Sequence, residues 1–265
     1  MEYGLSSFLF KTPSQKDWEE VKNSGYTWIE IIAFPWPGET LAKMKERTAK
    51  KAEDMKKGGL RLWTYHIPFG DEWDISALDD VERGKNVERN LEILEQAAEL
   101  GCRGVVIHPS YEPIPDEKRA LRIQHAHESV ARIAKRGKEL GVFVAIEDLP
   151  RSCLGNCSEE LMTIIESTGA KICFDVNHLL KESHAHFLEI AGKEIATLHL
   201  SDYDGVDERH FVPGDGIIDW KALVRTLKEL GYQGPYLFEV APERLDGRTP
   251  GDLIHCLNKA AGIGE

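Results

Sequence analysis

The sequence IAKRGKELGVFVAIE, residues 133–147, contains the pattern that decides the fold. Its first half places charged and apolar residues at helical spacing and ends at Gly141, and glycine commonly terminates helices. Its second half, residues 142–147, is apolar up to a final Glu, which predicts a buried strand. Residues 91–108 and 223–239 repeat this order of charged helix, glycine turn and apolar strand.

Five further short apolar segments complete a series of eight predicted strands separated by helical segments. These segments are residues 3–8, 28–32, 62–66, 172–175 and 197–200. Strands that are apolar along their length are typical of a parallel sheet covered by helices. We therefore expect an α/β fold, a single (β/α)8 TIM barrel, formed by one domain over residues 1–265. An open doubly wound sheet is the second choice, but no Gly-x-Gly-x-x-Gly loop follows the first strand to favour it.

Composition narrows the classes of partner and compartment. The chain is 42% hydrophobic and carries 45 acidic against 33 basic residues, a formal net charge of −12, which disfavours nucleic acid as a partner. No apolar run approaches the roughly 20 residues of a membrane span, and no secretory signal is visible. Five irregularly spaced cysteines are typical of a reducing compartment. We expect a soluble cytoplasmic protein without a membrane partner, and homo-oligomerisation stays open.

The last residues of six predicted strands are all metal-ligand or proton-transfer types. In chain order they are His66, His108, Glu147, Asp175, His199 and Glu239. Because parallel barrel strands end at one face, where barrel enzymes place their active sites, these side chains should meet. One such residue alone is more often a solvated or hydrogen-bonded group, but six in register favour a functional site.

A cluster of carboxylates and imidazoles is typical of a cation-binding site. Like charges at close range raise one another's pKa and destabilise the fold, and a divalent ion relieves that repulsion. This mixed donor set suits Mn²⁺, Mg²⁺, Co²⁺, Fe²⁺ or Zn²⁺ as cofactor. His178, Glu208 and His210 follow two of the strands and could curl over the barrel mouth, with loop scaffolding as the alternative.

The ordered motifs resemble the xylose isomerase-like barrel superfamily, which contains sugar and sugar-phosphate isomerases and epimerases and AP endonucleases of the endonuclease IV type. The resemblance covers essentially the whole chain. It rests on the segments 146–150, 174–178, 198–202, His210 with 214–216, and 238–239, which read IEDLP, FDVNH, LHLSD, GDG and FE.

In the epimerase branch, the resemblance implies one metal held by Glu147, Asp175, His199 and Glu239. It also implies that Glu147 and Glu239 are catalytic and exchange a proton with the substrate through a metal-bound enediolate. His178 would contact substrate oxygens. A dehydratase of the inosose or dehydroshikimate type would use the same metal and carboxylates, and the sequence does not separate these reactions.

The endonuclease branch implies three metals instead. His66, His108 and Glu147 would hold the first, the four residues named for the epimerase the second, and His178, Glu208 and His210 the third, although the nuclease pattern has Asp in place of Glu208. The loops at 69–74 and 201–208 are acidic, whereas a DNA-binding mouth should be basic. We therefore expect a small sugar or polyol substrate.

Three further residues are candidate substrate contacts. Glu30 lies on the inward side of the second strand and could bind a substrate hydroxyl or a ligand histidine. Trp36 could stack on a sugar ring, or pack locally. Arg151, four residues after Glu147, could hold a substrate phosphate or carboxylate, or face solvent.

Overall fold

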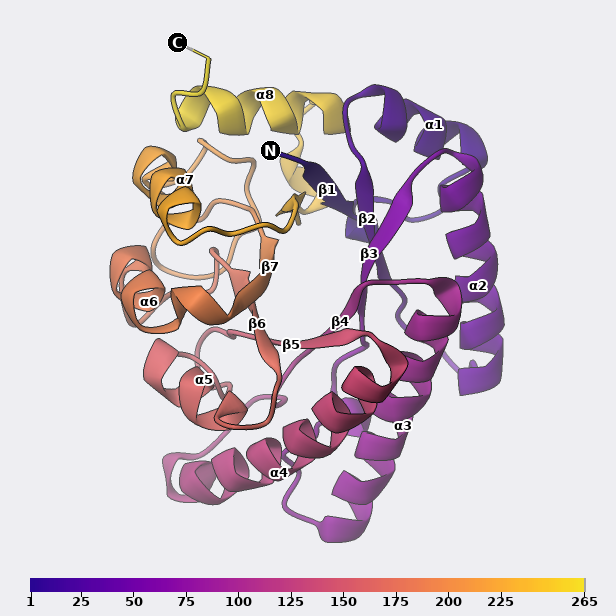
Figure 1. The fold of residues 1–265 in the computed structure, drawn as a ribbon, viewed down its shortest axis with the longest axis vertical. Helices are drawn as coiled ribbons and strands as arrows, with labels where there is room; N and C mark the ends of the chain where they lie inside the picture. The colour runs from indigo at the N-terminus through magenta and orange to yellow at the C-terminus, as the bar shows by residue number, and fades with distance from the viewer. Residues whose placement is uncertain (265) are drawn as a thin grey trace.

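The computed structural model describes residues 1–264, in which each of eight strands is followed by a helix (Figure 1). The strands are β1 (Tyr3–Ser6), β2 (Trp28–Ile32), β3 (Arg61–His66), β4 (Gly104–Ile107), β5 (Phe143–Glu147), β6 (Lys171–Asp175), β7 (Ile195–His199) and β8 (Tyr236–Phe238). The helices are α1 (Gln15–Asn23), α2 (Leu41–Lys57), α3 (Asp80–Leu100), α4 (Asp116–Leu140), α5 (Ser158–Ile165), α6 (His184–Ala191), α7 (Trp220–Glu229) and α8 (Pro250–Ala260).

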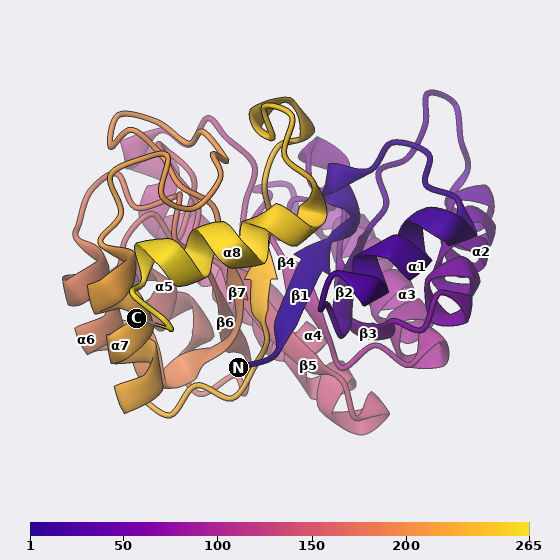
Figure 2. The same ribbon diagram turned by 90° about the horizontal axis from the view of Figure 1, so that it is seen from above.

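The strands form one parallel sheet that closes on itself. Their order is β7-β6-β5-β4-β3-β2-β1-β8, and a parallel bridge between Leu200 and Phe238 joins the two ends. The prediction of a single (β/α)8 barrel is therefore confirmed. Figure 2 shows the longer loops gathered at one end of the barrel, opposite the N-terminus. That end holds the carboxyl ends of the strands.

Local sequence signals set most element boundaries. Gly101 and Gly141 end α3 and α4 with φ of +76° and +70°, a left-handed conformation that glycine adopts without strain. Asp219 caps α7 by accepting a hydrogen bond from the backbone N–H of Ala222. The first strand is shorter than predicted, because Ser6 caps a 3-10 turn over Ser7–Leu9 and ends the extended backbone there.

Side chains close the amino-terminal end of the barrel. The Trp63 ring packs against Trp28 and Phe143 with centroid distances of 5.0 and 5.6 Å, and its Nε1 donates to Thr197 Oγ1 at 3.1 Å. Small buried residues fill the middle of the barrel, namely Val106, Ala145 and Cys173. The large apolar core lies between the strands and the surrounding helices. A ligand can therefore enter only at the carboxyl end.

In the part of the chain that the structure describes, no helix combines the length and the apolarity that crossing a membrane requires.

Lys51 on α2 is a largely buried cation that forms hydrogen bonds at the ends of β1 and β2. Its Nζ donates to Ser7 Oγ at 2.9 Å and to the Ile32 carbonyl at 3.3 Å. No carboxylate among residues 1–264 lies within ion-pair distance of it. Burial, aided by the charge of Arg47, lowers the pKa of Lys51 to about 8.

Replacing Lys51 by Met tests this buried charge. The folded chain binds fewer protons than the unfolded chain between about pH 8 and the ordinary lysine pKa near 10.4, so stability rises with pH across that window. We compare the unfolding free energies of the native chain and of Lys51→Met. The native value minus the variant value should rise by about 2–3 kcal/mol from the lower to the upper limit of this pH window. Urea denaturation at both limits measures the change, and a pH-independent difference would contradict the account.

Candidate metal centre

Four ligand-type side chains converge where strands β5 to β8 end. Glu147, Asp175 and His199 are the last residues of their strands, and Glu239 directly follows β8. One donor atom from each lies within 4.8 Å of the others, and all four residues are buried. His199 Nδ1 lies 3.0 Å from Glu147 Oε1, 3.1 Å from Glu239 Oε2 and 3.8 Å from Asp175 Oδ2. The strand ends thus bring together the four residues of the predicted single-metal site.

Glu30 fixes the orientation of the His199 ring. The fully buried Glu30 accepts hydrogen bonds at Oε2 from His199 Nε2 at 3.1 Å and from Thr64 Oγ1 at 2.8 Å. With its Nε2 proton engaged there, His199 presents Nδ1 to the carboxylates, which is the tautomer that a metal ligand requires. Glu30 does not line the pocket, so it contacts a candidate ligand histidine rather than a substrate position.

The cluster fits a divalent cation on the chemistry of its donors. Among the described residues, Asp175 Oδ2 is a buried oxygen without a hydrogen-bond partner, and it faces His199 Nδ1. Buried oxygens without partners are costly in an apolar interior. Three carboxylates and one imidazole supply the oxygen-rich donor set that Mn²⁺, Mg²⁺, Co²⁺, Fe²⁺ and Zn²⁺ accept.

Protons balance the charges of the cluster when no cation is bound. Burial raises the pKa of the Asp175 carboxyl well above its ordinary value. Burial acts to lower the pKa of His199, but the neighbouring thiol and carboxylates raise it well above its usual range. Burial acts to raise the pKa of Glu239, yet the charge of His199 holds it at about 2. Metal binding should therefore displace protons from Asp175 and His199.

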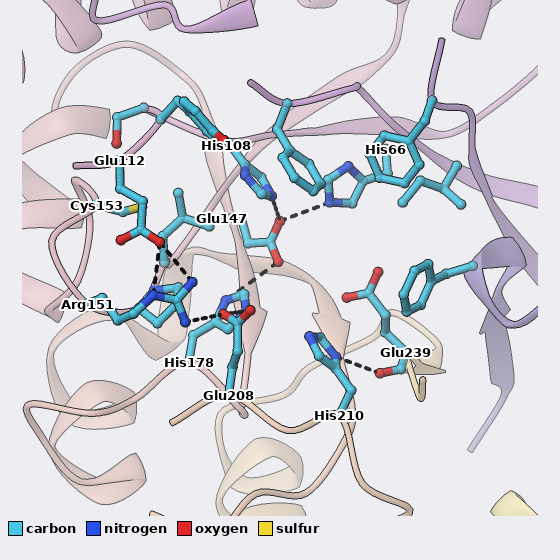
Figure 3. A pocket seen from close by; sticks show the side chains of 18 residues that line it. His66, His108, Glu112, Glu147, Arg151, Cys153, His178, Glu208, His210 and Glu239 are labelled. Atoms are coloured by element: carbon cyan, nitrogen blue, oxygen red, sulfur yellow. Dashed lines mark hydrogen bonds and ion pairs between the residues drawn. The ribbon is translucent and has the colours of Figure 1, made fainter. Parts of the chain in front are cut away.

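His66 and His108 gather on the other oxygen of Glu147 (Figure 3). Their Nε2 atoms lie 3.1 and 3.0 Å from Glu147 Oε2. Burial would lower the pKa of His66, but its hydrogen bond to Glu147 raises it to about 9. His66 Nδ1 donates to the Ile67 carbonyl at 2.9 Å, and the Phe69 ring stacks on His108 at 4.5 Å. Glu147 therefore stands between two groups of potential ligands.

His178 and His210 lie on the open side of Asp175. One donor atom of each lies within 4.8 Å of the others and of an Asp175 oxygen. Their Nδ1 atoms are engaged by the carbonyls of Asp148 and Glu239, at 2.8 and 3.0 Å, so Nε2 remains as the possible ligand atom, and that of His178 lies 3.6 Å from Asp175 Oδ2. Glu208, the further residue predicted for a third metal site, lies near His178 and Arg151. Its Oε2 is 3.6 Å from His178 Nε2 and forms an ion pair with Arg151 at 3.3 Å.

The pocket over this cluster has one apolar wall and one charged wall. Its empty volume is about 740 Å³, open mouth included. Phe8, Phe34 and Phe69 line one side, and Arg151 lies on the other. Trp36 does not reach the pocket. It is 61% exposed, and the Arg47 guanidinium covers its ring, so the predicted stacking on a sugar has no support in the fold.

Sequence reasoning missed three buried residues that hold the site together. Asp148 accepts the backbone N–H of Asp175 at 2.7 Å, and burial raises the pKa of its carboxyl. Asn177 Oδ1 accepts the N–H groups of Arg209 and His210 at 2.8 and 3.2 Å. Asp202 anchors the loop before α7. Acidic residues just after predicted strands, Asp148 after Glu147 and Asp202 three residues after His199, were signals that could have identified two of them.

Replacing Glu30 by Gln tests the support of His199. The amide keeps the shape of the side chain but can present its NH₂ group to Nε2, which would favour the wrong tautomer. We expect Mn²⁺ affinity to fall by roughly 10–100-fold, with the fold retained. Calorimetric titration with Mn²⁺ measures the change, and an unaltered affinity would remove Glu30 from the account of the metal centre.

The fold and its strand-end cluster define a class of (β/α)8 barrels with carboxylates and histidines at the mouth. Residues 18–258 match the family described as Xylose isomerase-like TIM barrel, and the chain belongs to this family.

Similar proteins include named epimerases. The uncharacterized protein MJ1311 of Methanocaldococcus jannaschii is 26% identical over 245 residues, covering 88% of this chain and 82% of that protein. Fructoselysine 3-epimerase of Escherichia coli O157:H7 is 20% identical over 244 residues, with 84% of each chain covered. The crystal structure of a D-tagatose 3-epimerase-like protein has a TM-score of 0.81 and 23% identity, covering 99% of this chain and 98% of that one. That likeness shows a shared fold.

Proposed function

We propose that this chain is a divalent-metal-dependent epimerase or isomerase that acts on a sugar or polyol. The observation that carries the proposal is a pair of buried carboxylates, Glu147 and Glu239, that line one pocket from the ends of β5 and β8. These strands are separated by two others around one side of the barrel and by four on the other. The two carboxylates therefore approach a bound molecule from different sides.

The chemistry needs a carbon acid and two proton-transfer groups. A divalent metal held by Glu147, Asp175, His199 and Glu239 would supply polarisation of a substrate carbonyl, which acidifies the adjacent C–H. Glu239 is suited to accept that proton because the charge of His199 keeps its carboxylate ionised. Glu147 is ionised as well, because the charges of His199 and His108 outweigh burial and hold its pKa well below the ordinary value. The protonated His66, whose Nε2 lies 3.1 Å from Glu147 Oε2, would supply the proton that Glu147 delivers to the other face of the deprotonated sugar, and exchange with solvent would restore both groups. Return to the opposite face inverts the carbon.

Other pocket residues would hold the substrate during this transfer. The Nε2 atoms of His178 and His210 can hydrogen-bond to substrate hydroxyls, since their Nδ1 atoms are already engaged by backbone carbonyls. Phe8, Phe34 and Phe69 would exclude water from the opposite side. The similarity to a named 3-epimerase over most of both chains supports the same class of reaction.

A second candidate function is phosphodiester cleavage by a cluster of three metals. The contacts of His66 and His108 with Glu147 Oε2, together with the group formed by Asp175, His178 and His210, favour it. The negative charge at the pocket opening argues against phosphodiester cleavage. Glu112, Asp207 and Glu208 surround the one pocket-lining arginine of the described chain, and DNA would meet these acids.

Metal analysis combined with a substrate panel tests the two functions. We expect one tightly bound divalent metal per chain and interconversion of a ketose with its epimer, with solvent deuterium entering the reacting carbon. Abasic DNA should stay intact. Three zinc ions per chain with cleavage of abasic DNA would overturn the epimerase proposal.

A further inference from the structure

Among the described residues that line the pocket, Arg151 is the one Lys or Arg. Its guanidinium already forms ion pairs with acidic side chains of the same chain. Its guanidinium lies 2.9 Å from Glu112, 2.8 Å from Asp207 and 3.3 Å from Glu208. These acids come from the loops that follow β4 and β7, and Figure 3 shows Glu112 and Glu208 on either side of Arg151. One positive charge therefore meets three negative charges.

The backbone holds Arg151 in this arrangement. Its φ is +54°, a left-handed conformation that is unusual for a residue with a side chain. Its carbonyl accepts a hydrogen bond from Asn156 Nδ2 at 2.7 Å, which ties the residue to its own loop. The surrounding carboxylates raise the pKa of Arg151 against the effect of burial. The guanidinium is thus not free to turn to an anionic ligand without breaking its own ion pairs.

A second observation comes from the loops after β7 and β8, where (β/α)8 barrels commonly seat a phosphate. Asp202 occupies the corresponding backbone donors after β7. Its Oδ2 accepts from Gly214 N at 2.9 Å and from Trp220 Nε1 at 2.8 Å, and its Oδ1 accepts from Tyr203 N at 3.0 Å and Ile218 N at 3.2 Å. Asp202 is fully buried. A carboxylate of the chain thus engages these N–H donors, which are then not available to an anionic ligand.

The aromatic side chains of the pocket are equally unsuited to an anion. Phe8, Phe34 and Phe69 face the charged wall across the opening, with the Phe34 and Phe69 rings packed edge to face at 5.1 Å. The part of a substrate that lies beside these rings or beside Arg151 therefore meets either aromatic side chains or a group of net charge −2. Both environments disfavour a phosphate, because it would lose hydration or meet like charge.

We infer that the pocket takes a ketose that carries neither phosphate nor carboxylate, and that the acids around Arg151 determine this specificity. The inference rests on the proposed epimerase function and adds the class of substrate. Arg151 then does not bind the substrate anion that one interpretation of the sequence predicted. Its ion pairs instead connect the loops that follow β4, β5 and β7.

Paired substrates test the inference. Deuterium exchange and epimer formation are measured with free ketohexoses and ketopentoses, and with the same sugars phosphorylated at the terminal carbon. For the metal-loaded native chain we expect kcat/KM to be at least about 100-fold higher for the free sugars. Equal or better use of the phosphorylated sugars would overturn the inference while leaving the epimerase function standing. Turnover of neither class would overturn the epimerase function, and the inference with it.

A double variant assigns the specificity to the acids. Glu112→Gln with Asp207→Asn removes two charges from Arg151 and should narrow the preference for free sugars by about tenfold. The control, Glu117→Gln with Glu128→Gln, removes two charges from exposed positions on α4 and should leave the preference unchanged. If the double variant does not fold, Glu112→Gln alone should shift the ratio in the same direction. An unshifted ratio in a folded variant would overturn the role of these acids.

Discussion

Replacing Glu239 by Gln is expected to slow exchange of the substrate's reacting C–H with heavy water by about 10²–10⁴-fold. The amide has the shape of the carboxylate but cannot accept the proton. Glu239 is ionised in the folded chain, since the charge of His199 keeps its pKa at about 2. NMR of the sugar in heavy water measures the exchange directly, without the need to separate the epimers.

Metal content must be determined in the same samples, because Glu239 is also a candidate ligand. Glu243→Gln is the matched control. It makes the same chemical change at an exposed position four residues along the chain, and exchange should keep its native rate. Native exchange in a metal-loaded Glu239→Gln variant would exclude Glu239 from the proton transfer.

Replacing Asp175 by Asn is expected to weaken Mn²⁺ binding by more than about 100-fold. This loss is larger than the one expected for Glu30→Gln, which changes a residue that only orients a ligand. The carboxyl is fully buried, its pKa is raised by burial, and one of its oxygens lacks a hydrogen-bond partner in the described chain. The substitution removes charge that a cation would balance. Without metal, the variant should be at least as stable as the native chain, because the buried Asp175 carboxyl must take up a proton on folding and Asn does not.

Thermal denaturation with and without Mn²⁺ checks both parts of this prediction. The native chain should gain stability on adding Mn²⁺, and the variant should gain much less. Asp219→Asn is the control, since Asn caps a helix about as well as Asp and this position lies at the start of α7, outside the cluster. Equal stabilisation of native and Asp175→Asn chains by Mn²⁺ would exclude Asp175 as a ligand.

The fold was predictable because its signals are local and repeated. Each apolar strand follows a helix that ends near glycine, and the parallel arrangement brings all strand ends to one face. That geometry also allowed the convergence of six strand-end side chains to be predicted from position, and the family resemblance singled out Glu147, Asp175, His199 and Glu239 among them. For a side chain on a strand, the alternation of strand residues predicts whether it points into the barrel or toward the helices.

The loops were less predictable because their side chains do not follow a period. Trp36 and Arg151 both lie in loops after strands and were treated alike as substrate contacts. The structure places the Trp36 ring under Arg47 in solvent and surrounds Arg151 with acids distant in sequence. Such ion pairs depend on contacts between loops that composition does not reveal. The aromatic wall of Phe8, Phe34 and Phe69 was missed for the same reason.

The central claim is a divalent metal held by Glu147, Asp175, His199 and Glu239. Anomalous diffraction from crystals of the protein soaked in Mn²⁺, recorded at the manganese edge, tests it most directly. The account predicts a peak in contact with His199 Nδ1 and with an oxygen of each of the three carboxylates. No peak at this position, or a peak bound only by His66 and His108, would contradict it.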